Sequence, residues 1–273
     1  LHIHSRFAYA TSPQLTVPNL VHWAKIKGID LLGTGDCLHP IWKEELKKQL
    51  RDLGNGFYLY DGINFVLSTE VSCIYSAEGR QRRIHILIYF PSFKSVELVE
   101  SALIKRGANL KADGRPIIGI SVQDLCQLVF DIEPKAIIVP AHIWTPWFGM
   151  YGSKSGFDFF QQCFGRFSDQ IYAIETGLSS DPAMNWRISE LDSKTIVSFS
   201  DAHSLPNLGR ELTIFAGNLS YDELADGIKN NKVVGTVEFF PEEGIYHYSG
   251  HRLCSVVYGP EEIRKNGPIC PVC

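Results

Sequence analysis

The first four residues of the chain include two histidines that could bind one metal ion. They read Leu1-His2-Ile3-His4. Side chains alternate between the two faces of an extended strand, so His2 and His4 would point to the same side. Imidazole nitrogens are common ligands of zinc and other divalent metals. The spacing therefore predicts that both histidines contribute to one metal site.

Further potential metal ligands recur where short apolar runs end. They are carboxylates and imidazoles, namely Asp36, His39, Glu70, His85, His142, Glu175, Asp201 and His203. A carboxylate can bridge two divalent metals about 3.5–4 Å apart, and such a pair stabilises both oxygens of a phosphoryl displacement. We expect a cluster of two or three divalent metals (zinc, manganese or magnesium). We expect Glu70, Glu175 and Asp201 to be the catalytic carboxylates.

The elements that must position these ligands alternate along the chain. Strands are predicted at residues 1–4, 29–34, 63–72, 83–90, 136–140, 171–175, 195–200, 211–215 and 232–240. Helices are predicted at residues 19–27, 41–53, 96–106, 121–129 and 221–229. This alternation is typical of a parallel α/β architecture, in which functional residues lie at the C-terminal ends of strands. We therefore predict a distorted seven-stranded (β/α) barrel.

Composition places the chain among ordinary globular proteins. It has 273 residues, 45% hydrophobic and 21% charged, with a net charge of -4 that does not indicate nucleic-acid binding. No apolar stretch approaches the ~20 residues of a membrane span, and no secretory leader is present, which favours a cytoplasmic protein without membrane contact. We expect a piece of a longer protein, with a barrel domain at 1–240 and the truncated start of a zinc-binding region at 241–273.

The last residues contain two close pairs of zinc-type ligands. His251 and Cys254 form one pair, Cys270 and Cys273 form the other, and fifteen residues separate the pairs. Two such pairs about 15–20 residues apart are typical of a structural zinc ribbon. We expect one structural zinc here, with His247 as an alternative to His251.

The order of the ligands resembles that of the PHP (polymerase and histidinol phosphatase) family over roughly residues 1–240. The most specific motifs are Leu1-His2-Ile3-His4-Ser5 and Ser200-Asp201-Ala202-His203-Ser204. The resemblance implies that His2, His4, Glu70 and Asp201 hold one metal and that Glu70 bridges to a second. His85 and His142 would hold the second metal, and Asp36, His39 and His203 would belong to a third position.

The chain departs from the family pattern at this third position. Many members place a histidine or aspartate where this chain has Tyr9 or Ala10, and a histidine where it has Cys37. His39 could replace the missing histidine, so occupancy of the third position stays open.

Several stretches are similar to the endonuclease Q group within this family. They are residues 5–13, Leu32-Gly33-Thr34-Gly35-Asp36, residues 140–148 and Gly250-His251-Arg252-Leu253-Cys254. The similarity implies a DNA repair nuclease that nicks 5′ of deaminated bases (hypoxanthine, uracil, xanthine) or abasic sites. It implies damaged DNA as the partner, and a replication sliding clamp as a second partner through sequence after Cys273.

Aromatic and basic residues near the proposed ligands could bind such a substrate. An enzyme that senses a damaged base extrudes it and stacks it on aromatic faces. We expect substrate contacts from the following residues: Ser12, Arg82, Arg83, Trp144, Trp147, Phe148 and Tyr151. The alternative for the aromatic loop is a lid that packs on the barrel, and for the arginines a solvated charged surface.

Two other functions fit the same ligands. One is a small-molecule phosphoesterase of the histidinol-phosphatase kind, and the other is a non-catalytic PHP interaction module. The predicted zinc-binding region favours the nuclease interpretation, because an enzyme that hydrolyses small phosphate esters does not need an additional zinc-binding region. The module is disfavoured because no core ligand is replaced.

Overall fold

The structure is a computed structural model that describes residues 1–273. Its helices are α1 (Val17–Lys27), α2 (Pro40–Gln49), α3 (Phe93–Lys105), α4 (Val122–Ile132), α5 (Phe160–Phe164), α6 (Pro182–Asn185), α7 (Tyr221–Lys229) and α8 (Pro260–Asn266). All five predicted helices are present, and α2 ends earlier than predicted because residues 51–52 form a strand. None of the helices has the length and apolar character needed to cross a membrane.

The strands form one large mixed sheet and three small sheets. They are β1 (Leu31–Gly33), β2 (Arg51–Asp52), β3 (Tyr58–Tyr60), β4 (Ile63–Ala77), β5 (Arg80–Phe90), β6 (Ile117–Ile118), β7 (Ile137–Pro140), β8 (Ala173–Glu175), β9 (Thr195–Val197), β10 (Leu212–Phe215), β11 (Val233–Val237), β12 (Ser249–His251) and β13 (Val256–Tyr258). The large sheet has the order β2-β3-β4-β5-β7, and β1 and β6 both pair with β4. The pairs β8–β9, β10–β11 and β12–β13 stand separately.

The prediction of a parallel architecture was wrong for the large sheet. β4 pairs antiparallel with both β3 and β5, and β5 pairs antiparallel with β7. Only β1 and β6 run parallel to β4. The strands also do not close into one barrel, since β8–β9 and β10–β11 are separate sheets. The fold is therefore mixed α/β.

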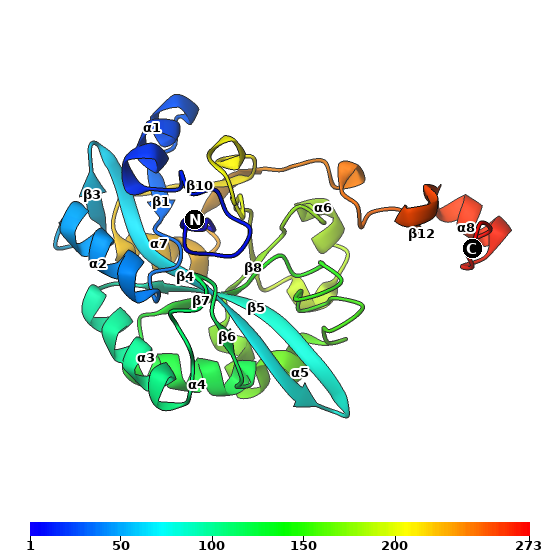
Figure 1. Cartoon of the computed structure of the whole chain (residues 1–273), viewed down its shortest axis with the longest axis horizontal. Helices are drawn as coiled ribbons and strands as arrows, with labels where there is room; N and C mark the ends of the chain where they lie inside the picture. The colour runs from blue at the N-terminus through cyan, green and yellow to red at the C-terminus, as the bar shows by residue number, and fades with distance from the viewer.

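The antiparallel pairing of β4 and β5 follows from the turn that joins them. Only Glu78 and Gly79 lie between these strands, and both have a positive φ, 52° and 72°. A two-residue loop with two positive φ angles is typical of a tight β-hairpin. The two long strands therefore form one continuous β-hairpin that crosses the molecule (Figure 1).

The hydrophobic core lies on both sides of the β4–β5 hairpin. Apolar side chains of α1–α4 pack in one large cluster with β4 and β5. A smaller cluster joins Tyr221, Leu224 and Ile228 of α7 to β7, β8 and β9. The Tyr221 hydroxyl lies 2.9 Å from the backbone carbonyl oxygens of both Tyr89 and Lys135, and its one O–H is shared between them, which ties α7 to the large sheet.

The two ends of the chain lie in different surroundings. The predicted strand at 1–4 is only a single bridge between Ile3 and Ala202, and the N-terminus lies inside the fold (Figure 1). This places His2 and His4 beside Asp201. The C-terminal segment, with β12 and α8, projects from the main body at the end of an extended connection (Figure 1), and it lines one cavity together with Pro146, Ser153 and Lys154.

Candidate metal centre

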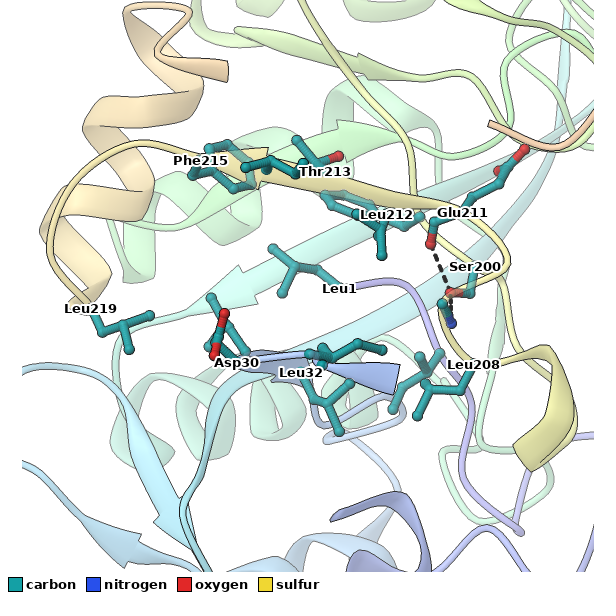
Figure 2. Close-up of a pocket in the computed structure, with 17 residues that line it drawn as sticks. Leu1, Asp30, Leu32, Ser200, Leu208, Glu211, Leu212, Thr213, Phe215 and Leu219 are labelled. Atoms are coloured by element: carbon teal, nitrogen blue, oxygen red, sulfur yellow. Dashed lines mark hydrogen bonds between the residues drawn. The ribbon is translucent and has the colours of Figure 1, made fainter. Parts of the chain in front are cut away.

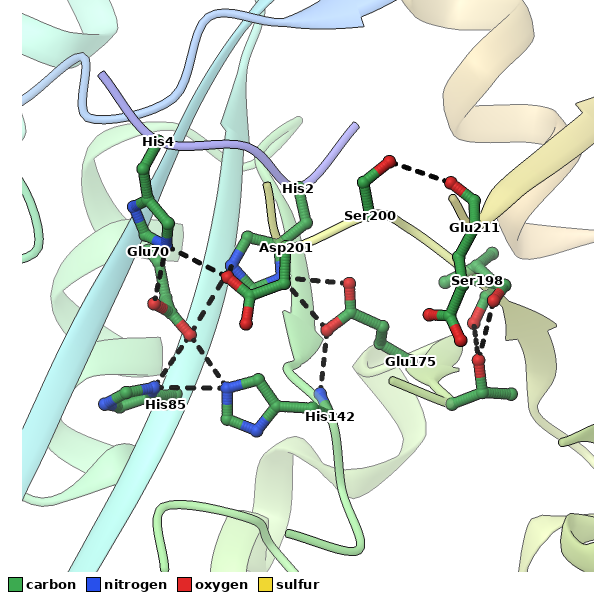
Figure 3. Close-up of polar contacts among 12 residues, drawn as sticks. His2, His4, Glu70, His85, His142, Glu175, Ser198, Ser200, Asp201 and Glu211 are labelled. Carbon is green, nitrogen blue, oxygen red and sulfur yellow. Dashed lines mark hydrogen bonds and ion pairs between the residues drawn. The ribbon is translucent and has the colours of Figure 1, made fainter. Parts of the chain in front are cut away.

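Three overlapping groups of metal-type ligands lie together inside the fold (Figure 3). They are His2, His4 and Glu70; His4, Asp201 and His203; and Glu70, His85 and His142. Within each group the ligand atoms lie within 4.8 Å of one another. Glu70 and His4 each belong to two groups, so the three groups form one continuous cluster.

Glu70 faces different partners with its two carboxylate oxygens. Its Oε1 lies 2.8 Å from Nδ1 of His85 and 3.2 Å from Nε2 of His142. Its Oε2 lies 3.4 Å from Nε2 of His4. Glu70 on β4 and His85 on β5 are diagonal neighbours in the hairpin register, which explains their proximity. Glu70 thus lies among four histidines, with His2, His85 and His142 on the side of Oε1 and His4 on the side of Oε2.

The N-terminal histidines are held by their Nδ1 atoms, so their Nε2 atoms face the cluster. Nδ1 of His2 lies 3.0 Å from Glu175, and Nδ1 of His4 lies 3.0 Å from Asp36. Their Nε2 atoms lie 3.3 and 3.2 Å from Oδ1 of Asp201. Carboxylates that hold the second nitrogen of a metal-binding histidine are a common feature of metal sites.

The cluster has the chemistry that a divalent metal requires. The Nε2 atom of His2 is fully buried and has no hydrogen-bond partner. Burial lowers the pKa of His2, but Glu175, Asp201 and Glu70 raise it to about 10. Burial raises the pKa of Glu70, yet His85 and His2 hold it well below its usual range. Buried carboxylates thus require positive charge here, and divalent metals would supply it.

Three site residues have unusual backbone conformations. Asp36, His142 and Asp201 have φ angles of 48°, 28° and 43°. Left-handed conformations cost energy in residues other than glycine and persist where the surroundings enforce them, often at functional sites. Each of the three residues follows a strand (β1, β7 or β9), and the turn directs its side chain toward the cluster.

Three predicted site residues lie around the groups rather than within them. Asp36 accepts a hydrogen bond from the backbone N–H of Ser5 at 2.6 Å, in addition to its contact with His4. Glu175 accepts one from the backbone N–H of His142 at 2.7 Å. His39 caps α2 and accepts a hydrogen bond from the backbone N–H of Trp42. Its ring stacks on Phe7 with the centroids 4.5 Å apart.

The predicted substrate loop is largely packed against the protein. Trp144 and Tyr151 pack together with ring centroids 4.9 Å apart, and Phe148 lies 4.3 Å from the His85 ring. Trp147 differs, because it is 47% exposed and lies under the Arg83 guanidinium at 5.1 Å. Of the four aromatic residues, Trp147 is the most exposed, and it lies beside a positive charge.

The other predicted substrate residues have partners within the protein. Arg82 stacks on Phe157 at 4.1 Å and pairs with Glu78 at 2.6 Å. The hydroxyl of Ser12 accepts a hydrogen bond from the backbone N–H of Gln14 at 3.2 Å. Sequence analysis missed Arg115, whose Nη1 lies 3.3 Å from Oε2 of Glu70. It lies in a loop before β6 that carries no ligand-type motif.

The C-terminal ligands also lie together. His251, Cys254, Cys270 and Cys273 place their ligand atoms within 4.8 Å of one another. Backbone N–H groups of Cys273 and Val272 lower the pKa of Cys270 to about 6, which favours the thiolate that zinc binds. This set fits a closed tetrahedral zinc site.

An apolar cavity is lined by chain neighbours of the metal-type ligands, among them Leu1 and Ser200 (Figure 2). Its volume is about 210 Å³, and its walls include Leu1, Leu32, Leu212 and Phe215. None of the metal-type ligands lines this cavity.

Comparison with curated proteins gives two relatives, and no family model matches the chain. An uncharacterised protein of Methanocaldococcus jannaschii is 34% identical over 146 residues, which is 54% of this chain and 16% of that protein. Uncharacterised YqxK of Bacillus subtilis is 28% identical over 246 residues, which is 86% of this chain and 61% of YqxK. The chain thus spans less than two thirds of the length of either relative.

Two solved structures match along the whole chain. The lesion-specific endonuclease PfuEndoQ from Pyrococcus furiosus is 29% identical, with a TM-score of 0.87 over 100% of this chain and 66% of that one. Endonuclease Q in complex with a 27-mer duplex, with an abasic lesion at the active site, is 30% identical. Its TM-score is 0.86 over 100% of this chain and 67% of that one.

Fold and site together define the class of the protein. A mixed α/β fold that gathers histidines and carboxylates from two long strands and from the loops around them into one buried cluster is that of a PHP-domain protein. Within this class the chain belongs to the endonuclease Q family.

Proposed function

We propose that this chain is the metal-dependent catalytic part of a DNA repair endonuclease that nicks the strand 5′ of a deaminated base or an abasic site. One observation carries the proposal. The structure of endonuclease Q with an abasic lesion at its active site matches all of this chain, including the C-terminal segment.

The buried cluster supports hydrolysis of a phosphodiester. His2, His4 and Asp201 would hold one metal, and His85 and His142 would hold a second, with Glu70 between them. When bound, such a pair activates water and stabilises negative charge on the phosphate oxygens. Asp36 and Glu175 would fix the orientation of the histidine rings. Asp201 is 25% exposed, so the cluster opens to solvent on its side.

The C-terminal cluster has a separate role in this proposal. His251, Cys254, Cys270 and Cys273 would hold one structural zinc, which stabilises a segment with little apolar core of its own. Large apolar side chains are exposed there, among them Leu253, Ile269 and Val272 at 91, 81 and 67%. A structural metal compensates for such a small core.

Nicking of defined duplexes tests the proposal. End-labelled duplexes carry one hypoxanthine, one uracil, one abasic site or no lesion, and are incubated with the protein and manganese or magnesium. We expect a metal-dependent nick 5′ of the lesion with 3′-hydroxyl and 5′-phosphate ends, and an intact undamaged duplex. Asp201→Asn should lose the nick while its melting temperature stays close to that of the parent. Hydrolysis of small phosphate monoesters without any nick would instead support the phosphoesterase alternative.

A further inference from the structure

Arg115 is a positively charged side chain in contact with the metal-type cluster. Its Nη1 lies 3.3 Å from Oε2 of Glu70, and its side chain is 21% exposed. Oε2 is also the oxygen that faces His4. The guanidinium therefore sits beside the cluster and remains partly open to solvent.

The loop before β6 holds Arg115 in this place through several backbone contacts. The backbone N–H of Arg115 donates to Oδ1 of Asp113 at 2.9 Å, and the same oxygen accepts from the backbone N–H of Tyr9 at 3.1 Å. Gly114 N–H donates to the carbonyl of Phe7 at 2.9 Å. A Cβ at Gly114 would lie 2.5 Å from Oδ2 of Asp36, so only glycine permits this approach. The arginine is thus fixed against the segment that carries His4.

Most of the guanidinium remains available to a ligand. A guanidinium has five N–H donors, and its one hydrogen bond within the protein goes to Glu70. Arg82 differs, since its Nη1 and Nη2 already donate to Gly156 and Glu78. A divalent cation bound to Oε2 of Glu70 would compete with Arg115 for that oxygen and free the guanidinium.

We propose that Arg115 binds a non-bridging oxygen of the substrate phosphate at the metal centre and that it pairs with Glu70 when no metal is bound. The inference rests on the proposed function for the identity of the phosphate. Guanidinium groups recognise phosphate through paired N–H donors in a fixed planar geometry. A charged donor beside the cluster would orient the phosphate and balance its negative charge.

The test separates phosphate binding from metal binding. Calorimetry measures the affinity of the parent, Arg115→Gln and Arg115→Lys for manganese, and then the affinity of each manganese-loaded protein for inorganic phosphate. Arg115→Gln should bind manganese no more weakly than the parent, because the competing cation is gone. It should bind phosphate roughly tenfold to a hundredfold more weakly. The phosphate affinity of Arg115→Lys should lie between those of the parent and Arg115→Gln, since lysine keeps the charge and loses the planar geometry.

Arg106→Gln is the matched control. Arg106 is exposed at the end of α3, and its guanidinium makes no hydrogen bond or ion pair, so both affinities should equal those of the parent. Unchanged phosphate affinity in Arg115→Gln, or loss of manganese binding, would overturn the inference. If Arg115→Gln does not fold, Arg115→Lys decides by the same two measurements. Lesion nicking by the parent is scored separately, so a failure of the proposed function is recognised independently of phosphate binding.

Discussion

The Glu175 carboxylate lies 3.0 Å from Nδ1 of His2, while Nε2 of the same ring faces Glu70 at 3.6 Å. Glu175 also accepts a hydrogen bond from the backbone N–H of His142. One buried carboxylate therefore orients ligands from two distant parts of the chain. This placement favours a positioning role for Glu175 over a role as ligand or base.

Replacing Glu175 tests this role. We expect Glu175→Gln to reduce metal affinity and nicking rate by about 10- to 100-fold, because a carboxylate behind a metal-binding histidine contributes about that much. The pH profile of the remaining activity should keep its shape. Glu70→Gln, which alters the shared carboxylate, should abolish nicking. A changed acid limb of the profile in Glu175→Gln, with unchanged metal affinity, would show that Glu175 acts as a base.

Trp147 is the best candidate for base stacking in the aromatic loop. Its ring is 47% exposed and should contribute roughly 1–3 kcal/mol to the binding of an extruded base. Trp147→Ala should therefore weaken binding of lesion duplexes by about tenfold to a hundredfold and leave hydrolysis of a small phosphodiester unchanged. Trp144→Ala is the contrasting variant, since Trp144 packs on Tyr151 and donates to Asn185 at 2.8 Å, and it should lower the melting temperature. Equal loss of both activities in Trp147→Ala would contradict a stacking role.

The C-terminal cluster should bind one zinc independently of the metal centre. Cys270→Ser should remove one zinc per chain by elemental analysis and make residues 245–273 more sensitive to protease. Structural zinc stabilises its own segment, so the melting of the larger fold should change little. Val272→Ser is the matched control, because Val272 is exposed between two proposed ligands. Equal zinc content in Cys270→Ser and the control would refute this site.

Glu211 should make the protein less stable as the pH rises. It is 1% exposed, and its Oε2 has no hydrogen-bond partner. Burial, with Glu175 and Glu238 nearby, raises its pKa from 4.5 to about 8. Between these two values the folded state holds a proton that the unfolded state has lost, so stability falls by up to about 1.4 kcal/mol per pH unit. Above the folded pKa this group causes no further change.

Urea unfolding at pH 5 and pH 9 tests this prediction. Glu211→Gln should match the parent at pH 5 and exceed it at pH 9, because the amide stays neutral. Glu243→Gln should follow the parent at both values, since Glu243 is exposed. An equal difference between Glu211→Gln and the parent at the two pH values would contradict the assignment.

Local patterns predicted the elements better than their arrangement. The helices α1 and α7 lie close to their predicted bounds because each has a clear start and end in the sequence. The antiparallel hairpin was missed because strands predicted at 63–72 and 83–90 left a gap that hid the Glu78-Gly79 turn. Once both strands extend to the Glu78-Gly79 turn, a two-residue loop leaves only the antiparallel direction.

In the candidate site too, the sequence predicted which residues take part better than it predicted how they are arranged. His2, His4, Glu70, His85 and Asp201 come together, as the recurrence of such residues after apolar runs and the order of the ligands indicated. Sequence alone could not distinguish a histidine that faces the cluster from one that caps a helix, and His39 directly precedes Pro40 at the start of α2. No sequence motif identifies Arg115 as a site residue, because its position depends on the packing of its loop against residues 7–9.

We propose that the buried cluster binds two divalent metals bridged by Glu70. Anomalous diffraction from crystals grown with manganese tests this proposal, with zinc at Cys254, Cys270 and Cys273 as an internal reference. We predict two manganese peaks about 3.5–4 Å apart, one bonded to each oxygen of Glu70. His2, His4 and Asp201 should bind one, and His85 and His142 the other. A zinc peak at the cysteines with no manganese bonded to Glu70 would contradict the proposal.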